Sequence, residues 1–198
     1  MKSVIFGIVL AAGLGRRMGM PKALVRLGDR TFHERAVRAF LDARFQVVVV
    51  VNPVVKDALP AEVAGERRVL NPDPDQAGGM MGSVRIGVAL ATALGASGVV
   101  ILPVDYPLVT SDDVRAVAEA LSMHAPIAVA GHGDRRGHPI GINHEIMEDV
   151  LNDPSLTTLR DVVRRDPGRV VAVEASPGVV LGVNTRDDLD RVAKRPFR

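Results

Sequence analysis

Residues Ser3–Leu10 read SVIFGIVL and lead directly into a glycine- and arginine-rich loop, AAGLGRRMGMPK, at residues Ala11–Lys22. An uninterrupted apolar run predicts a strand buried on both faces, which is typical of a parallel sheet covered by helices. In such sheets, ligands bind beyond the carboxyl ends of the strands. This stretch therefore predicts an α/β fold, and its loop is the first place to look for a binding site.

Strand-like and helix-like patterns alternate through the first two thirds of the chain. Apolar, often valine-rich runs predict further strands at Phe45–Val51, Arg67–Asn71, Gly98–Leu102 and Ile127–Ala130. Helical spacing and capping residues predict helices at Thr31–Ala43, Val54–Gly65, Ser83–Leu94 and Thr110–Ser122. This alternation predicts a mostly parallel sheet with helices on both faces.

The pattern changes after the fifth strand. A glycine-bounded turn at Gly131–Gly137 leads into His138–Ile142, which predicts an antiparallel hairpin. Short helices are then expected at Glu145–Leu151 and Thr157–Arg165, strands at Arg169–Glu174 and Val179–Gly182, and a closing helix at Asp187–Lys194. We therefore predict one domain over residues 1–198. Its expected fold is an α/β Rossmann-like three-layer sandwich with a mostly parallel sheet, helices on both faces and an antiparallel hairpin.

The composition excludes several classes of function. Cysteine is absent, which rules out disulfides, thiolate zinc sites and cysteine nucleophiles. The net charge is only +2 and aromatic residues are 3% of the chain, so neither a basic stripe nor base-stacking platforms are expected and no nucleic-acid partner is predicted. The first apolar run is too short to span a bilayer. A soluble cytoplasmic protein without a membrane partner is the simplest interpretation.

The loop after the first strand matches neither of the two common nucleotide motifs. A dinucleotide fingerprint needs G-x-G-x-x-G, but Met18 stands at the third glycine position. It also needs an acidic residue after the second strand, where the sequence reads Val51-Asn52-Pro53. A P-loop needs Gly-Lys-Ser/Thr, whereas Lys22 follows a proline and precedes an alanine. An oxidoreductase that uses NAD is therefore disfavoured.

A different phosphate-binding loop remains. Small residues allow the backbone N–H groups to approach a triphosphate, and Arg17 and Lys22 would supply positive charge. A strand-to-helix turn with solvated arginines is the simpler alternative. At the end of the fourth strand, Asp105 lies in a proline-bounded loop at the same sheet edge, where a metal ligand and a turn-capping residue are equally good interpretations of it.

The complete pattern L-A-A-G-x-G-x-R-M-G-x-P-K resembles the signature of the sugar-phosphate and molybdopterin nucleotidyltransferases. Within that superfamily, the chain is most similar to the molybdenum-cofactor nucleotidyltransferases. Four further segments have counterparts there, in the same order: Gly79–Gly87, Leu102–Val109, Gly137–Pro139 and Val183–Leu189. The resemblance thus runs almost from end to end.

This resemblance implies a Mg²⁺-dependent transfer of a nucleoside monophosphate from a nucleoside triphosphate to a small phosphorylated acceptor such as molybdopterin, with release of pyrophosphate. The segment Asp153–Arg160 departs from the molybdopterin cytidylyltransferase pattern, so a sugar- or polyol-phosphate acceptor is an alternative. A non-catalytic nucleotide-binding or cofactor-chaperone module is the alternative from another class. The presence of Arg17, Lys22 and Asp105 together favours an enzyme.

The resemblance also assigns site residues. Arg17, Lys22 and Asp105 are the expected catalytic residues, Asp105 and Asn184 the expected metal ligands, and His138 and Arg160 the expected acceptor-binding residues. The nucleotide-binding set is Leu10, Ala11, Ala12, Gly13, Gly15, Asn71, Gly79 and Ser83. Helix capping by Ser83 and turn formation by Asn71 and Asn184 are the simpler alternatives.

Two smaller expectations concern Ala12 and the Met80–Met81 pair. Guanylyl-transferring relatives resemble Leu-Ala-Gly-Gly, so the methyl group of Ala12 predicts a smaller base and a preference for CTP over GTP. The methionine pair is expected to serve packing.

Overall fold

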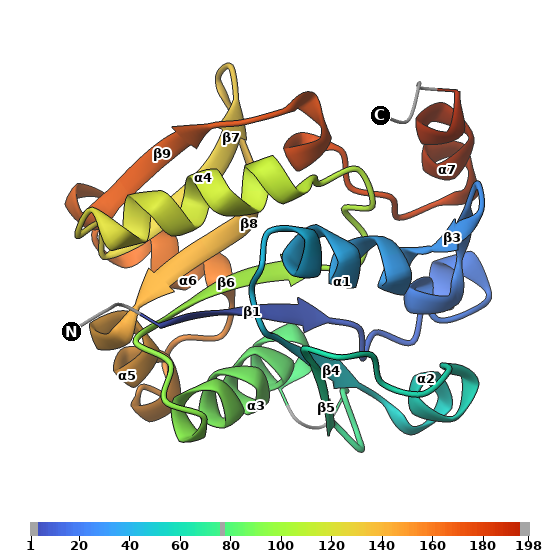
Figure 1. Ribbon diagram of the computed structural model, residues 1–198, viewed down its shortest axis with the longest axis horizontal. Helices are drawn as coiled ribbons and strands as arrows, with labels where there is room; N and C mark the ends of the chain where they lie inside the picture. The colour runs from blue at the N-terminus through green and yellow to red at the C-terminus, as the bar shows by residue number, and fades with distance from the viewer. Residues whose placement is uncertain (1–3, 76–77, 195–198) are drawn as a thin grey trace.

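The computed structural model describes residues 4–75 and 78–194 of the chain; Ser3, predicted to begin the first strand, lies outside them. A seven-stranded sheet forms the centre, in the order β5-β4-β1-β6-β8-β7-β9 (Figure 1). Its strands are β1 (Ile5–Leu10), β4 (Val47–Val51), β5 (Glu66–Leu70), β6 (Gly98–Pro103), β7 (Ile127–His132), β8 (Arg135–Asn143) and β9 (Val170–Glu174). All pairings are parallel except those that β8 makes with β6 and β7. A separate two-stranded hairpin joins β2 (Arg26–Leu27) and β3 (Arg30–Thr31).

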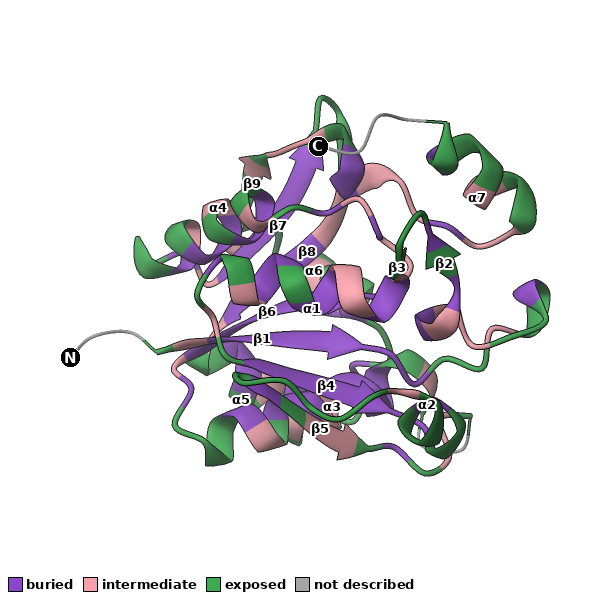
Figure 2. Ribbon diagram, turned by 45° about the vertical axis from the view of Figure 1, so that its right-hand side comes forward, coloured by how far each residue is buried: buried purple, intermediate pink, exposed green. Residues whose placement is uncertain are grey.

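Helices cover both faces of the sheet, which confirms the predicted α/β sandwich. On one face, α1 (Phe32–Asp42) and α4 (Ser111–Ser122) pack against the sheet. The other face is covered by α3 (Gly79–Ala93), α5 (His144–Asn152) and α6 (Leu159–Arg165). Helices α2 (Pro53–Ala58) and α7 (Arg186–Ala193) lie at the periphery and are mostly exposed, whereas the central strands are buried (Figure 2). None of the described helices is both long and apolar enough to cross a membrane.

The apolar runs account for the central strands. All five residues of β4 are valines with no exposed surface, as expected for a strand covered on both faces. Leu10 aligns with Val50 on one side and with Pro103 on the other, so β1, β4 and β6 end at the same edge. The loops that follow these strands therefore meet at one place, as the parallel topology predicts.

Threonine N-caps begin α1, α4, α6 and α7, each with an acidic residue three positions later that completes a capping box. Three predicted elements differ in the structure. Helix α2 ends at Ala58 because Pro60 and the residues around it adopt an extended backbone. The predicted strand Val179–Gly182 is instead a 3-10 turn, Pro177–Val180. Helix α3 starts at Gly79 rather than at Ser83, so Ser83 lies inside the helix and does not cap it.

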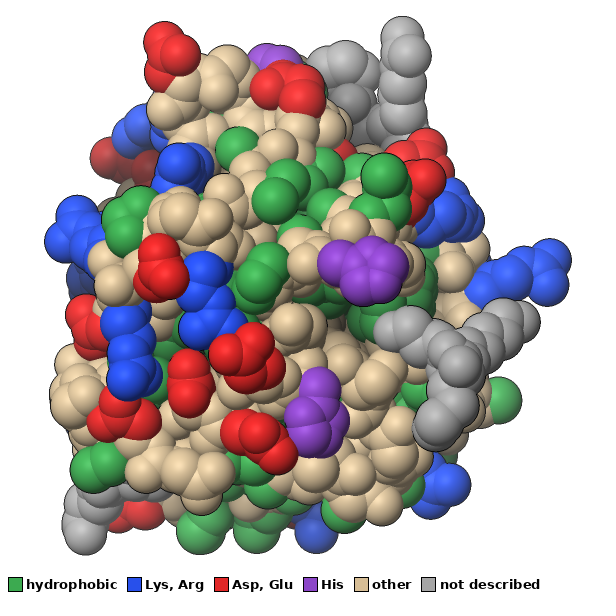
Figure 3. Space-filling view, turned by 90° about the vertical axis from the view of Figure 1, so that its left-hand side faces the viewer, with side chains coloured by type: hydrophobic (Ala, Val, Ile, Leu, Met, Phe, Trp, Pro, Cys, Tyr) green, Lys and Arg blue, Asp and Glu red, His purple; other side chains and the backbone are tan. Residues whose placement is uncertain are grey.

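At the amino ends of the strands, acidic and basic side chains interleave (Figure 3). Two carboxylates of α5 form ion pairs with arginines outside it: Asp149 with Arg165 of α6, and Glu145 with Arg169 just before β9. Exposed pairs of this kind each stabilise a fold by only about 0–1 kcal/mol. This face therefore carries mixed charge.

Glu66 is a buried carboxylate held by three hydrogen bonds. It accepts from Arg68 Nε at 2.7 Å and from the Val63 amide at 3.2 Å, and it lies 3.1 Å from His33 Nε2. Burial raises the pKa of Glu66, but the bonds from His33 and Arg68 outweigh burial and lower the pKa from 4.5 to about 2. The folded state therefore favours the ionised form of Glu66.

This shift predicts acid sensitivity. Because the folded pKa lies below the unfolded value, the stabilisation is complete above about pH 4.5 and is lost as the pH falls toward 2. We expect the wild type to lose about 2 kcal/mol more unfolding free energy than Glu66→Gln between pH 6 and pH 3. Urea unfolding of both proteins at the two pH values measures this, and equal losses would show that Glu66 does not carry the effect.

Candidate active site

A cavity of about 210 Å³ opens where the loops after β1 and β6 meet the start of α3. Six of the eight residues predicted to bind nucleotide line it: Leu10, Ala12, Gly13, Gly15, Gly79 and Ser83. Lys22 and Asp105 line it as well. The structure thus brings most of the predicted site residues into one place, from segments that are up to 95 positions apart in the sequence.

The loop after β1 offers free hydrogen-bond donors. No acceptor in the described part of the chain bonds the backbone N–H groups of Gly13, Leu14 and Gly15. Gly15 adopts a left-handed backbone with φ +62°, and a Cβ there would lie 1.9 Å from the carbonyl oxygen of Met20. Successive N–H groups in such a turn form a nest for an anion such as a phosphate.

Asn52 holds the base of this loop and was not identified from the sequence. Its Nδ2 donates to the carbonyl of Ala12 at 2.8 Å, and its Oδ1 accepts from the amide of Val55 at 2.8 Å. Asn52 is therefore both the N-cap of α2 and a buried anchor for the loop. The signal was present, since an asparagine before proline at the end of a strand is a common helix N-cap.

Lys22, Asp105 and Asn184 form a charged cluster beside the cavity. The Lys22 ammonium lies 2.8 Å from Asp105 Oδ2 and 2.7 Å from Asn184 Oδ1. Arg17 Nη2 lies 3.3 Å from the same amide oxygen of Asn184. The Lys22 and Asp105 side chains are each only 17% exposed, so their charges interact with less screening than on an open surface.

Two predicted nucleotide residues lie behind the cavity wall. Ala11 is fully buried, belongs to the hydrophobic core and donates its N–H to Val50. Asn71 is also fully buried, and its Nδ2 donates to Ser83 Oγ at 2.9 Å. Neither residue lines the cavity. Ala11 supports the loop from the core, and Asn71 positions Ser83, while the buried Oδ1 of Asn71 has no partner among the described residues.

Leu14, Met80 and Asp75 line the cavity but were missed as site residues. Met81 is 1% exposed and packs in the core as predicted, but Met80 is 55% exposed, so its predicted packing role is wrong. Asp75 pairs with Arg16, which joins the loops on the two sides of the cavity. Exposed apolar side chains on a cavity wall are suited to contact a planar ring.

His138 lies at the end of β6 because β8 runs antiparallel to it and aligns Ile140 with Ile101. Its ring packs against Tyr106, with centroids 4.7 Å apart, and its buried Nδ1 has no partner among the described residues. Burial lowers the pKa of His138 to about 4, against an opposing effect of Asp105, so the ring is neutral at pH 7. This residue is therefore near Asp105 and keeps a free polar atom.

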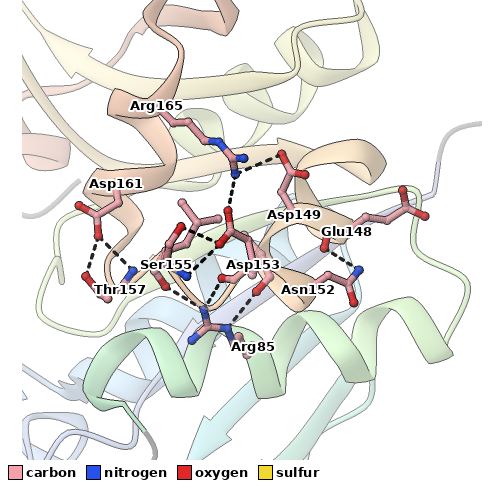
Figure 4. Close-up of polar contacts among 11 residues, drawn as sticks. Arg85, Glu148, Asp149, Asn152, Asp153, Ser155, Thr157, Asp161 and Arg165 are labelled. Carbon is pink, nitrogen blue, oxygen red and sulfur yellow. Dashed lines mark hydrogen bonds and ion pairs between the residues drawn. The ribbon is translucent and has the colours of Figure 1, made fainter.

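Arg160, the other predicted acceptor residue, is exposed on α6 and does not line the cavity. The segment in front of it is tied to α3 by Arg85 (Figure 4). Arg85 Nε donates to the carbonyl of Val150 at 3.0 Å, and Nη2 donates to those of Asp153 and Leu156 at 2.9 and 2.8 Å. The segment Asp153–Arg160, which differs in sequence from the cytidylyltransferase pattern, therefore packs against α3 through Arg85.

Arg85→Met is expected to lower the unfolding free energy by about 2–4 kcal/mol, because three carbonyls in a half-buried setting lose a charged donor. Arg160→Met should change it by less than about 0.5 kcal/mol, since the side chain is exposed. Chemical unfolding of both variants tests this difference. If Arg160→Met raises the KM for the acceptor, Arg160 contributes to acceptor binding as the sequence predicted.

The oxygen atoms of Asp105 and Asn184 suit a hard divalent cation. No group of three histidine, cysteine or carboxylate side chains that could hold a metal occurs in the described ranges. Mg²⁺ needs no such group, because it keeps several waters and also binds phosphate oxygens of its substrate. Both oxygens already contact one positive charge, the ammonium of Lys22.

A glycine-rich nest, adjacent cations and a carboxylate at the end of a parallel strand are suited to hold a triphosphate and a divalent cation, and comparison with known proteins identifies the class as nucleotidyltransferase. The chain belongs to the MobA-like NTP transferase domain family, whose model matches residues 7–170. The molybdenum cofactor guanylyltransferase of Rhodobacter capsulatus is 30% identical over 200 residues, covering 96% of both chains. The one from Rhizobium johnstonii is 33% identical over 141 residues, or 70% of this chain and 62% of that one.

Solved structures share the fold over nearly the whole chain. A nucleotidyl transferase from Methanothermobacter is 25% identical with a TM-score of 0.77, and 96% of each chain is covered. The Rv0371c protein of Mycobacterium tuberculosis is 26% identical with a TM-score of 0.75, covering 98% of this chain and 100% of that one. These comparisons confirm the family resemblance inferred from the sequence motifs.

Proposed function

We propose that this chain transfers a nucleoside monophosphate from a nucleoside triphosphate to molybdopterin or a similar phosphorylated acceptor, with release of pyrophosphate. One observation carries the proposal: Lys22, Asp105 and Asn184 converge beside a cavity lined by the free N–H groups of the loop after β1. The family membership and the names of the relatives support it.

In this reaction an oxygen of the acceptor phosphate attacks the α-phosphorus, and the bond from that phosphorus to the bridging oxygen breaks. Pyrophosphate leaves with the electron pair. The acceptor oxygen is already anionic, so no general base is required. The protein contributes position and positive charge: the N–H groups of Gly13–Gly15 would hold phosphates, and Arg17 and Lys22 would stabilise charge on the leaving group.

A divalent cation fits the donor set of Asp105 and Asn184, and we propose Mg²⁺. When bound, it would neutralise charge on the phosphate oxygens. A structure of Rv0371c from Mycobacterium tuberculosis has been solved as a complex with manganese, which supports the proposal of a divalent cation. Asp105 and Asn184 are well placed for such a role, because the Val183 amide donates to the Asp105 carbonyl at 2.7 Å and fixes the two segments together.

The donor base is the part of the proposal where sequence and relatives disagree. Ala12 predicted CTP, but the curated relatives are named guanylyltransferases, so the comparison does not support that prediction. We therefore propose GTP as the preferred donor. The methyl group of Ala12 still lies at the cavity wall and limits the room next to a bound base.

In competition binding, the wild type is expected to prefer GTP to CTP. Ala12→Gly should shift the affinity ratio further toward GTP by about tenfold or less, because a single methyl group in a pocket is worth only about 1–3 kcal/mol. Tighter binding of CTP by the wild type would reinstate the prediction from Ala12. An unchanged ratio in the variant would show that the methyl group does not contact the base.

The acceptor is proposed to lie near His138 and Tyr106, on the side of Asp105 where the neutral ring keeps a free nitrogen. A sugar or polyol phosphate remains the second candidate, because the segment Asp153–Arg160 lacks the cytidylyltransferase pattern. Pyrophosphate release with each nucleoside triphosphate, against molybdopterin, sugar phosphates and polyol phosphates, tests the proposal. Nucleotide binding without pyrophosphate release for any acceptor would favour the non-catalytic module.

A further inference from the structure

The Lys22 ammonium lies where a divalent cation would meet its protein ligands. It donates to Asp105 Oδ2 at 2.8 Å and to Asn184 Oδ1 at 2.7 Å, so two of its three N–H bonds go to the two proposed metal ligands. A carboxylate and an amide oxygen that face one positive charge form a small cation site. In this structure the cation is a side chain of the protein itself.

The backbone holds all three residues in this arrangement. Lys22 begins a short 3-10 turn after Pro21. The Asp105 and Asn184 segments are joined by the bond from the Val183 amide to the Asp105 carbonyl. The backbone N–H of Asn184 donates to the carboxylate of Asp188 at 3.0 Å, which fixes the backbone of Asn184. The two oxygens are therefore positioned before any metal arrives.

We propose that Lys22 occupies the metal position in the nucleotide-free protein, so that a divalent cation binds weakly until the phosphates of the nucleotide draw the ammonium away. This inference rests on the proposed function. An ammonium and a divalent cation that face the same two oxygens repel each other, so each weakens the binding of the other. Metal and nucleotide would then bind cooperatively, and Lys22 would be a positioning residue for the metal before it contacts phosphate.

The cavity supplies the alternative partner that this exchange needs. Lys22 lines the same cavity as Gly13, Leu14 and Gly15, whose N–H groups have no acceptor among the described residues. A polyphosphate held by these groups offers its oxygens to the ammonium. Arg17, at 3.3 Å from Asn184, can keep the amide oriented after Lys22 leaves.

The test compares two probes on the same variants. Binding of Mn²⁺ alone is measured by electron paramagnetic resonance, and binding of the preformed Mn²⁺–tripolyphosphate complex is measured by calorimetry. Lys22→Met is expected to bind Mn²⁺ alone about tenfold more tightly than the wild type, because the competing cation is gone. The same variant should bind Mn²⁺–tripolyphosphate more weakly, because it has lost a phosphate contact.

Three further variants make the comparison specific. Lys22→Gln repeats it with a second neutral side chain, in case the methionine disturbs the loop. Lys56→Met removes an exposed lysine on α2 and should match the wild type with both probes. The double variant Lys22→Met/Asp105→Asn should lose the added Mn²⁺ affinity.

The proposal requires opposite changes in affinity: the neutral Lys22 variants bind Mn²⁺ alone more tightly than the wild type and Mn²⁺–tripolyphosphate more weakly. If both neutral variants bind Mn²⁺ alone no more tightly than the wild type, or bind both probes more tightly, the proposal is overturned. Neither probe involves a transferable nucleotide or an acceptor. A chain without transferase activity can therefore still show the reversal, and an active transferase without it overturns this inference alone.

Discussion

Asp105→Asn is expected to lower kcat by about 10²–10³-fold at moderate Mg²⁺ while the protein remains folded. The substitution keeps the size of the side chain and one oxygen but removes the only carboxylate of the cluster with Lys22 and Asn184. Losing a charged metal ligand removes stabilisation of the charge that develops on the phosphates. Raising the Mg²⁺ concentration should recover part of the activity, since the loss is one of metal affinity.

Asp75→Asn is the matched control for this variant. Asp75 also lines the cavity, but its side chain is 55% exposed and pairs with Arg16 at the surface. Its replacement should change kcat by less than about threefold, because exposed ion pairs contribute little. Activity of Asp105→Asn equal to the wild type at every Mg²⁺ concentration would remove Asp105 from the metal site.

The second large effect is expected for Lys22→Met, with a loss in kcat of about 10²–10³-fold and a smaller loss in nucleotide affinity. A contact that strengthens as charge develops on the leaving pyrophosphate lowers kcat more than binding. Arg17→Met should act in the same direction with a smaller effect, because its contact to Asn184 is longer, at 3.3 Å. Steady-state kinetics together with equilibrium nucleotide binding separates the two quantities.

Arg16→Met is the control here, since Arg16 is the neighbouring cation and its side chain is 76% exposed. It should leave kcat nearly unchanged. If Lys22→Met loses nucleotide affinity and kcat by the same factor, Lys22 only binds the ground state. If neither quantity changes, the arginines and the lysine of this loop are ordinary solvated residues.

The alternation of apolar runs and helical patterns was sufficient to predict the sheet, the two helical layers and the hairpin. A strand such as Val47–Val51 has no other stable place than the middle of a covered sheet. Errors arose where short segments depend on tertiary partners. Val179–Gly182 looks like a strand, but in the folded chain its first residues belong to a 3-10 turn, Pro177–Val180, that packs against β7 and β8.

The site was predictable where the chemistry is local and less so where it depends on distant contacts. The loop Ala11–Lys22 and Asp105 could be identified because strand ends meet at one edge. Asn184 came only from the family resemblance, since nothing in its own neighbourhood indicates that it lies 2.7 Å from Lys22, 162 positions away. Met80 and Arg85 show the same limit. Met80 reaches the cavity because α3 begins at Gly79, and Arg85 bonds to carbonyls that lie at least 65 positions away in the sequence.

The start of α3 illustrates why. Gly78 and Gly79 both have left-handed backbone, with φ +82° and +63°, and such glycines usually end helices. Here they form the start of one: Gly78 is the N-cap of α3 and Gly79 its first residue, so the helix begins four residues before Ser83, and the Ser83 hydroxyl accepts a hydrogen bond from Asn71. A serine that precedes an apolar pattern is a strong N-cap signal, but the tertiary contact with Asn71 overrides it.

The central claim is transfer of a nucleoside monophosphate, and tracing the α-phosphate tests it most directly. The protein is incubated with α-³²P-labelled GTP or CTP, Mg²⁺ and each phosphorylated acceptor, and the labelled products are separated. The label is expected in a new diphosphate-linked product in equal amount to the pyrophosphate released, and Asp105→Asn is expected to lower the rate of formation of both by about 10²–10³-fold at moderate Mg²⁺. Label that remains in the triphosphate for every acceptor, with folded protein and bound nucleotide, would contradict the claim.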